Sequence, residues 1–230
     1  MKRSLQPEIM DSEEISAEEI AQVYREIQKV NRWLGNTAAI LRRLQATTMR
    51  PLRILDIGCG HGGLLLQIRD HMALKYSGAH HFGVKAPNVE VLGIDLRSAP
   101  PDSQVPILTG NAVTDSLPAA DIAICVLLAH HLSESDLAGM IVNVSRSCQR
   151  FLILDLVRHP VPLWLFRLFV APFLNRINAS DGQTSIRRAY TAAELGRIVQ
   201  QATTGGRPIQ SLRHTVALFW TRQIVEIHWQ

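Results

Sequence analysis

A loop of alternating glycines next to a carboxylate has the clearest chemical potential in this sequence. Gly58, Gly60 and Gly62 follow Asp56 at every second position. Glycine lets a chain turn sharply and lets a ligand approach main-chain N–H groups without an intervening Cβ. The spacing differs from the dinucleotide pattern G-x-G-x-x-G, and Asp56 would repel a pyrophosphate but attract an ammonium group. A tight turn without a ligand would use the same glycines, so the loop alone leaves both interpretations open.

The elements around this loop predict an α/β fold. Five apolar runs have the length of buried strands: 52–57, 89–96, 105–108, 121–127 and 150–156. Helical patterns lie between them, which predicts a parallel sheet covered on both faces. Two further strands, at 209–216 and 217–228, have no helix between them, so we expect a C-terminal antiparallel hairpin. Ligands bind at the carboxyl ends of such strands, so residues that follow the first four strands are expected to do chemistry.

The chain is expected to form one domain at residues 16–230, preceded by a disordered tail at 1–15. Its length of 230 residues and its 47% hydrophobic content suit a single domain with a large core. The capping-box pattern that begins at Ser16 opens an N-terminal helical cap, which we place at 16–48.

The bulk properties argue against several classes of protein. The net charge is +4 and the basic residues are scattered, so a nucleic-acid partner, which needs a concentrated basic face, is not expected. Three cysteines without a CxxC pair give no disulfide framework, which favours the cytoplasm. The polar N-terminus does not resemble a signal peptide, and no apolar run reaches the roughly 20 residues of a membrane span. We also predict no metal site.

The sequence LRILDIGCGHGGLL at 52–65 closely resembles motif I of the class I S-adenosylmethionine-dependent methyltransferases. The resemblance extends over roughly residues 20–230 and is strongest over 50–132. Within that family, the resemblance points to the enzymes that methylate small molecules, loosely related to the quinone-biosynthesis methyltransferases. It implies a Rossmann-like domain that binds S-adenosylmethionine, with the carboxylate before the glycines near the ammonium group of the cofactor.

The same resemblance implies a set of cofactor-binding residues. Asp95 ends a segment that matches the second strand of the family, where the carboxylate accepts hydrogen bonds from both ribose hydroxyls. Asn111 stands where the family usually has aspartate, and its carbonyl oxygen would contact the adenine, unless it only shapes the loop turn. The implied set is Asp56, Gly58, Cys59, Gly60, Gly62, Asp95, Leu96, Asn111, Ala112 and Leu127.

Two adjacent histidines follow the fourth strand, in a segment that resembles the family's loop at this position. Imidazole suits proton abstraction from a hydroxyl near neutral pH, so His130 and His131 are the candidate catalytic residues. Neighbouring side chains point in different directions, so only one is expected to face the methyl acceptor. The other would hydrogen-bond the backbone or cap the helix that begins near Ser133. A role for both in packing the turn is the alternative.

An apolar stretch at 161–174 lies where the family often inserts part of its substrate cover, so residues 157–188 are assigned to a substrate lid. An ordinary core helix or a contact with a membrane surface would also explain this composition. The arginines that follow either steer an acidic acceptor or are surface charges. The expected acceptor-side residues come from the lid and the helical cap: Tyr24, Trp33, Trp164, Phe169 and Arg187.

The reaction implied is methyl transfer to a small organic acceptor, with a phenolic, quinone-like or polyketide-type hydroxyl favoured. Carbon methylation of a quinol-like ring is the nearest enzymatic alternative. A module that binds the cofactor without turnover is a third possibility. RNA methylation is not favoured, because the RNA cytosine enzymes use a Pro-Cys nucleophile and Cys148 has no proline before it.

Overall fold

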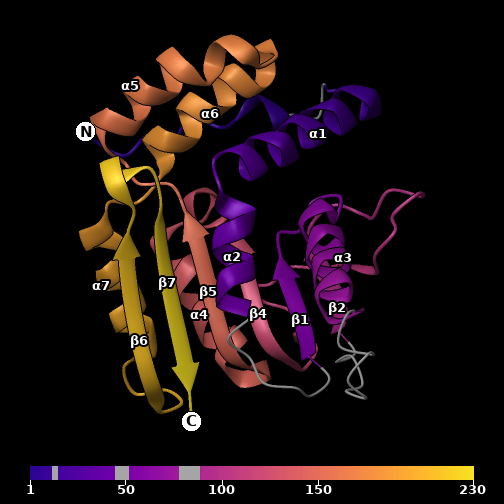
Figure 1. Ribbon diagram of the computed structural model, residues 1–230. Helices are drawn as coiled ribbons and strands as arrows, with labels where there is room; N and C mark the ends of the chain where they lie inside the picture. The colour runs from indigo at the N-terminus through magenta and orange to yellow at the C-terminus, as the bar shows by residue number, and fades with distance from the viewer. Residues whose placement is uncertain (12–14, 45–51, 78–88) are drawn as a thin grey trace.

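The computed structural model describes residues 1–11, 15–44, 52–77 and 89–230. A seven-stranded sheet lies at the centre, in the order β3-β2-β1-β4-β5-β7-β6 (Figure 1). Its strands are β1 (Leu52–Ile57), β2 (Val89–Asp95), β3 (Ile107–Thr109), β4 (Ala120–Val126), β5 (Cys148–Asp155), β6 (Ile209–Val216) and β7 (Gln223–Trp229). Strands β1 to β5 run parallel, whereas β7 pairs antiparallel with both β5 and β6. The predicted α/β sheet with its C-terminal antiparallel hairpin is confirmed.

Helices cover both faces of this sheet because its central strands are apolar on both sides. One face packs against α2 (Asn36–Leu44) and α3 (Gly63–Ser77), and the other against α4 (Glu134–Ser147) and α7 (Ala192–Thr203). Alternate residues of β1 divide between the two cores, with Ile54 facing α2 and α3. Leu55 faces α4 and α7.

A third group of helices lies across the carboxyl ends of the parallel strands. It consists of α1 (Ala17–Trp33), α5 (Pro160–Phe169) and α6 (Arg176–Arg188), which Figure 1 shows above the sheet. The Asn178 side chain of α6 donates hydrogen bonds to the Val23 carbonyl and to Glu26 of α1, which joins the two segments. None of the described helices is both long and apolar enough to cross a membrane.

Residues 1–11, which we call the N-terminal strap, are bound to the domain, so the prediction of a disordered tail is wrong for them. The Arg3 side chain donates to the carbonyls of His130, Leu132 and Arg188. The main-chain N–H groups of Ile9 and Met10 donate to the Asp181 carboxylate at 2.7 and 2.9 Å. A polar composition did not prevent ordering, because the partners of the strap are polar groups rather than an apolar core. Residues 12–14 lie outside the described part.

The boundaries of several elements differ from the predicted ones. Helix α3 continues to Ser77, and residues 78–88 lie outside the described part of the chain. The helical cap consists of two helices, and 45–48 lie outside the described residues. The last strand begins at Gln223 rather than 217, because the hairpin turns through Phe219 and Trp220, whose φ angles are 60° and 53°.

Candidate functional site

A cavity of about 550 Å³ lies at the carboxyl edge of the sheet, below α1 and α6. This volume is in the range of small-molecule sites. Residues that follow β1, β2 and β4 line it, together with residues of the strap, α1 and α6. The location agrees with the rule that ligands of parallel sheets bind at this edge.

The glycine loop after β1 has a backbone conformation that requires glycine. Gly58, Gly60 and Gly62 have φ angles of 71°, 53° and 74°, in the left-handed region that side chains disfavour. A Cβ on Gly60 would lie 2.5 Å from Cε1 of Tyr24, so the loop also approaches α1 closely. Gly62 does not line the cavity, and a Cβ there would lie 2.4 Å from Val105. Its predicted cofactor contact is therefore replaced by a packing role.

Two carboxylates lie beside this loop. Asp95 accepts a hydrogen bond from the Gly60 N–H at 2.8 Å and one from the Arg97 N–H at 3.0 Å. Asp56 is only 2% exposed and lines the cavity, and among the described residues its side chain has no hydrogen-bond partner. Burial raises the pKa of Asp56 well above its usual range, and the neighbouring Asp95 charge raises it further.

This arrangement fits S-adenosylmethionine. A buried carboxylate without a partner is stabilised by a cation that enters the cavity, and the cofactor carries an ammonium group. The Asp95 carboxylate lies at the carboxyl end of β2, the position that the family uses for the ribose. Asp56 and Asp95 would therefore hold the two polar ends of one ligand, with the glycine backbone between them.

The other predicted cofactor residues also line the cavity, with different exposures. Cys59, Ala112 and Leu127 are half-buried there, and Leu96 is 72% exposed. Asn111 lines it as well, but its side-chain oxygen already accepts the Val113 N–H at 2.9 Å. The loop-turn role that the sequence left as an alternative for Asn111 is therefore present in the structure.

The histidine pair lies on a short 3-10 turn directly after β4. His130 is buried, and its Nδ1 donates to Asp155 at 2.7 Å, while its main-chain N–H donates to the same carboxylate. His131 is more exposed, with 22% of its side chain accessible, and it also lines the cavity. Leu127, just before the turn, has a φ of 56°, which costs backbone energy for a branched side chain. Such strain is often found at functional sites.

The two histidines differ in access to the cavity, and the carboxylates around His130 determine its protonation. Burial lowers the pKa of His130, but the Asp155 and Glu8 carboxylates outweigh it and raise that pKa to about 9. His130 is therefore charged near neutral pH and unsuited to accept a proton. One histidine was expected to hydrogen-bond the backbone or to cap the next helix, and His130 is the enclosed one of the two. However, that histidine bonds a carboxylate rather than a carbonyl, and Ser133 caps α4 in its place.

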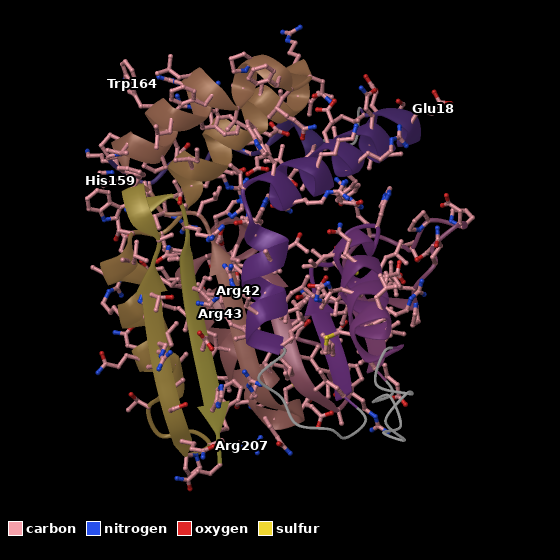
Figure 2. All side chains as sticks on the ribbon, in the orientation of Figure 1. Glu18, Arg42, Arg43, His159, Trp164 and Arg207 are labelled. Carbon is pink, nitrogen blue, oxygen red and sulfur yellow. The ribbon has the colours of Figure 1, made fainter. Side chains whose placement is uncertain are left out.

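Of the predicted acceptor-side residues, Tyr24 lines the cavity, whereas the four others do not. Trp33, Trp164 and Phe169 are 62%, 66% and 59% exposed and do not line the cavity. Figure 2 shows Trp164 on the outer side of α5. Arg187 does not reach the cavity, whereas its neighbour Arg188 does. Helical spacing identifies an amphipathic lid but does not show which of its large side chains face inward.

The lid nevertheless contributes to the cavity through residues that were not singled out from the sequence. Phe166 and Leu174 line it. A Cβ on Gly182 would lie 2.2 Å from Cζ of Phe166, so α6 needs a glycine where the ring packs. The glycine inside an otherwise helical stretch was the signal that could have located this contact.

Asp56→Asn should make the protein more stable in the absence of ligand. At neutral pH we expect the free energy of unfolding to rise by about 1–3 kcal/mol, because the amide removes a buried carboxylate that has no partner. Since the folded-state pKa is raised, this gain should be largest above that pKa and vanish below the ordinary value of 3.8. Urea unfolding across this pH range measures it, with exposed Asp70→Asn as the control. A loss of stability in Asp56→Asn would contradict the assignment.

Comparisons with known proteins identify the fold. No family model matches the sequence, and no curated protein does. The plantazolicin methyltransferase BamL, solved with a triazolic desmethylPZN analog and SAH, is 12% identical, with a TM-score of 0.66. The match covers 91% of this chain and 90% of that chain.

Two further solved structures are similar to this chain. Human N-acetylserotonin methyltransferase in complex with SAM is 14% identical with a TM-score of 0.58, over 99% of this chain and 63% of that chain. A candidate O-methyltransferase from Nostoc punctiforme is 13% identical with a TM-score of 0.55, over 84% of this chain and 56% of that chain. This chain thus spans little more than half of the latter protein. The chain has the fold of the class I S-adenosylmethionine-dependent methyltransferases.

Proposed function

We propose that this protein is an S-adenosylmethionine-dependent methyltransferase that acts on a hydroxyl of a small organic acceptor, of the phenolic, quinone-like or polyketide type. The observation that carries the proposal is the buried carboxylate of Asp56, which lines the same cavity as Asp95 and His131. A buried carboxylate favours a cationic ligand, and an imidazole favours an acceptor that releases a proton. The two requirements together describe this reaction.

The walls of the cavity support an acceptor with an apolar or aromatic body. Side chains of α1 and of the lid contribute apolar surface: Ile27, Val30, Phe166, Leu174 and Ile186. Burial of apolar area is worth about 25 cal/mol per Å², so these walls would supply much of the affinity for such a molecule. The named ligands of the neighbours are consistent with this class, since BamL was solved with a desmethylPZN analog and the human enzyme is named for N-acetylserotonin.

The residues of the chain would each have a distinct role in the reaction. When bound, S-adenosylmethionine supplies an activated methyl group. Asp56 would hold its ammonium and Asp95 its ribose, while the glycine backbone accommodates the ligand without a Cβ. The apolar walls would exclude water and align the acceptor, which lowers the entropic part of the barrier.

His131 is the candidate for proton removal, because it is neither enclosed nor bonded to Asp155. It would take the hydroxyl proton as the oxygen–carbon bond forms and the sulfur–carbon bond breaks, leaving the electron pair of the broken bond on sulfur. His130 would hold the turn in place through Asp155. This division of roles follows from the different exposure of the two rings.

The test is an assay with methyl-labelled S-adenosylmethionine and a panel of phenols, hydroquinones and resorcinols. We expect label in a methyl ether, and slower transfer by Asp95→Ala when the S-adenosylmethionine concentration is low. Transfer by His71→Ala should be normal, because this histidine is exposed on α3 and does not line the cavity. Label attached to a ring carbon would refute the choice of oxygen. Failure of the wild-type protein to bind the cofactor would refute the whole proposal.

A further inference from the structure

Three potential metal ligands converge where the strap meets the histidine turn. Oε1 of Glu8 lies 3.5 Å from Nε2 of His130 and 3.6 Å from Nε2 of His131. The three ligand atoms all lie within 4.8 Å of one another. Glu8 and His130 are buried, and all three residues line the cavity. Two imidazoles and one carboxylate make a donor set that transition metals prefer.

The distances from Glu8 to the two imidazoles leave room for a shared ion. Contacts of 3.5 and 3.6 Å exceed the usual length of a strong, charge-assisted hydrogen bond. Two ligand atoms at about 2.05 Å from a tetrahedral Zn²⁺ lie about 3.4 Å apart, and an octahedral edge would be about 3.0 Å. The separations from Glu8 to the two imidazoles are close to the tetrahedral value.

A second carboxylate lies behind each imidazole. Nδ1 of His130 donates to Asp155 at 2.7 Å, and Nδ1 of His131 lies 3.4 Å from Asp11. Metal-binding histidines usually donate their other ring nitrogen to such a partner, which fixes the tautomer and leaves Nε2 available. Both rings therefore direct Nε2 to Glu8. Binding of the ion would displace the proton that charged His130 carries on this nitrogen and release it to water.

We propose that Glu8, His130 and His131 bind one divalent transition-metal ion, with Zn²⁺ as the best fit, and leave its fourth position open to the cavity. Three carboxylates, Glu8, Asp11 and Asp155, gather around two imidazoles, so the cluster favours positive charge. This site was not predicted from the sequence, because Glu8 is more than 120 positions from its partners.

The role of the ion in catalysis rests on the proposed function, although its binding does not. At the open position the ion would bind the oxygen of a hydroxyl acceptor and lower the pKa of that hydroxyl, so that the proton leaves to water before methyl transfer. In the metal-bound protein His131 would therefore be a ligand, and the ion would replace it as the group that promotes proton loss. The strap would thereby complete the acceptor site, since Glu8 is one of the ligands. Acceptors with a phenolic oxygen, rather than a carbon nucleophile, would be selected.

The test is a titration of the chelator-treated full chain with Co²⁺, followed by its visible absorption, and with Zn²⁺ by calorimetry. We expect one equivalent to bind to the wild type. Glu8→Gln and His131→Ala should weaken binding at least 100-fold. Asp11→Asn should weaken it about 10–100-fold, because it removes only the outer partner of His131.

Matched controls separate ligand loss from misfolding. Glu18→Gln and His71→Ala change exposed residues of the same types outside the cavity and should bind the metal as the wild type does. Circular dichroism and affinity for S-adenosylhomocysteine check the fold of each variant. Absence of metal binding by the wild type, or wild-type binding by a folded His131→Ala, would overturn the proposal.

Activity assays distinguish a failure of the proposed metal role from a failure of the proposed function. If the metal-free protein methylates its acceptor at the full rate, the role of the ion in the reaction is wrong, while methyl transfer stands. If the metal binds but no acceptor is methylated under any condition, the metal site stands and the proposed function fails.

Discussion

His131→Ala should lower turnover by about 10²–10⁴-fold, the usual contribution of a group that assists proton removal. The side chain lines the cavity beside the candidate acceptor space and remains partly accessible. Its loss should leave the affinity for S-adenosylmethionine nearly unchanged, because Asp56 and Asp95 are untouched. Single-turnover rates and calorimetric affinity together measure this effect, with His71→Ala as the control.

His130→Ala should be distinguished by its cost in stability. The side chain is buried against Asp155 and Glu8, and removing one member of such a network costs about 3–5 kcal/mol. Urea unfolding measures this loss, which His131→Ala should not share. If both variants kept full turnover, alignment of the reactants alone would drive the reaction, and neither imidazole would take part.

Gly60→Val should abolish measurable binding of S-adenosylmethionine. The backbone of Gly60 has a φ of 53°, which a β-branched residue adopts only at high cost, and its Cβ would overlap the Tyr24 ring. The change would also displace the Gly60 N–H that donates to Asp95. Calorimetry measures the affinity, and Gly206→Ala is the control, because no atom lies within 4 Å of a Cβ at Gly206.

Asp95→Ala tests the carboxylate that is assigned to the ribose of the cofactor. We expect the affinity for S-adenosylmethionine to fall by about 1–3 kcal/mol, or roughly 5- to 150-fold, because two charged hydrogen bonds are lost. Unchanged affinity would refute the assignment of this carboxylate to the ribose, even if Gly60→Val bound nothing.

The sequence was sufficient for those parts of the fold that depend on local patterns. The capping box predicted at Ser16 is present at the start of α1, because its hydrogen bonds lie within four residues. The strand at 52–57 was predicted with its observed bounds. Continuous apolar runs between helices allow few arrangements other than a covered parallel sheet.

The parts that could not be predicted depend on contacts between distant segments. Glu8 lies in a polar stretch that resembles a disordered tail, and only the folded chain brings it to His130 and Ser185. The lid is amphipathic, but the side that faces the cavity is set by packing on α6, so Phe166 was missed while Trp164 was chosen. Local periodicity contains no information about such choices.

Attachment of the strap has a consequence for the order of folding. Its partners include Arg187 and Arg188, and its hydrogen bonds to them span more than 170 positions in sequence. Because loop closure over such a distance precedes any gain from the contact, the strap should dock last, after the sheet and α6 have formed. It should also be among the first segments to open in the native state. Amide hydrogen exchange at Ile9 and Met10, whose N–H groups are bonded to Asp181, should therefore be faster than at the amides of β4.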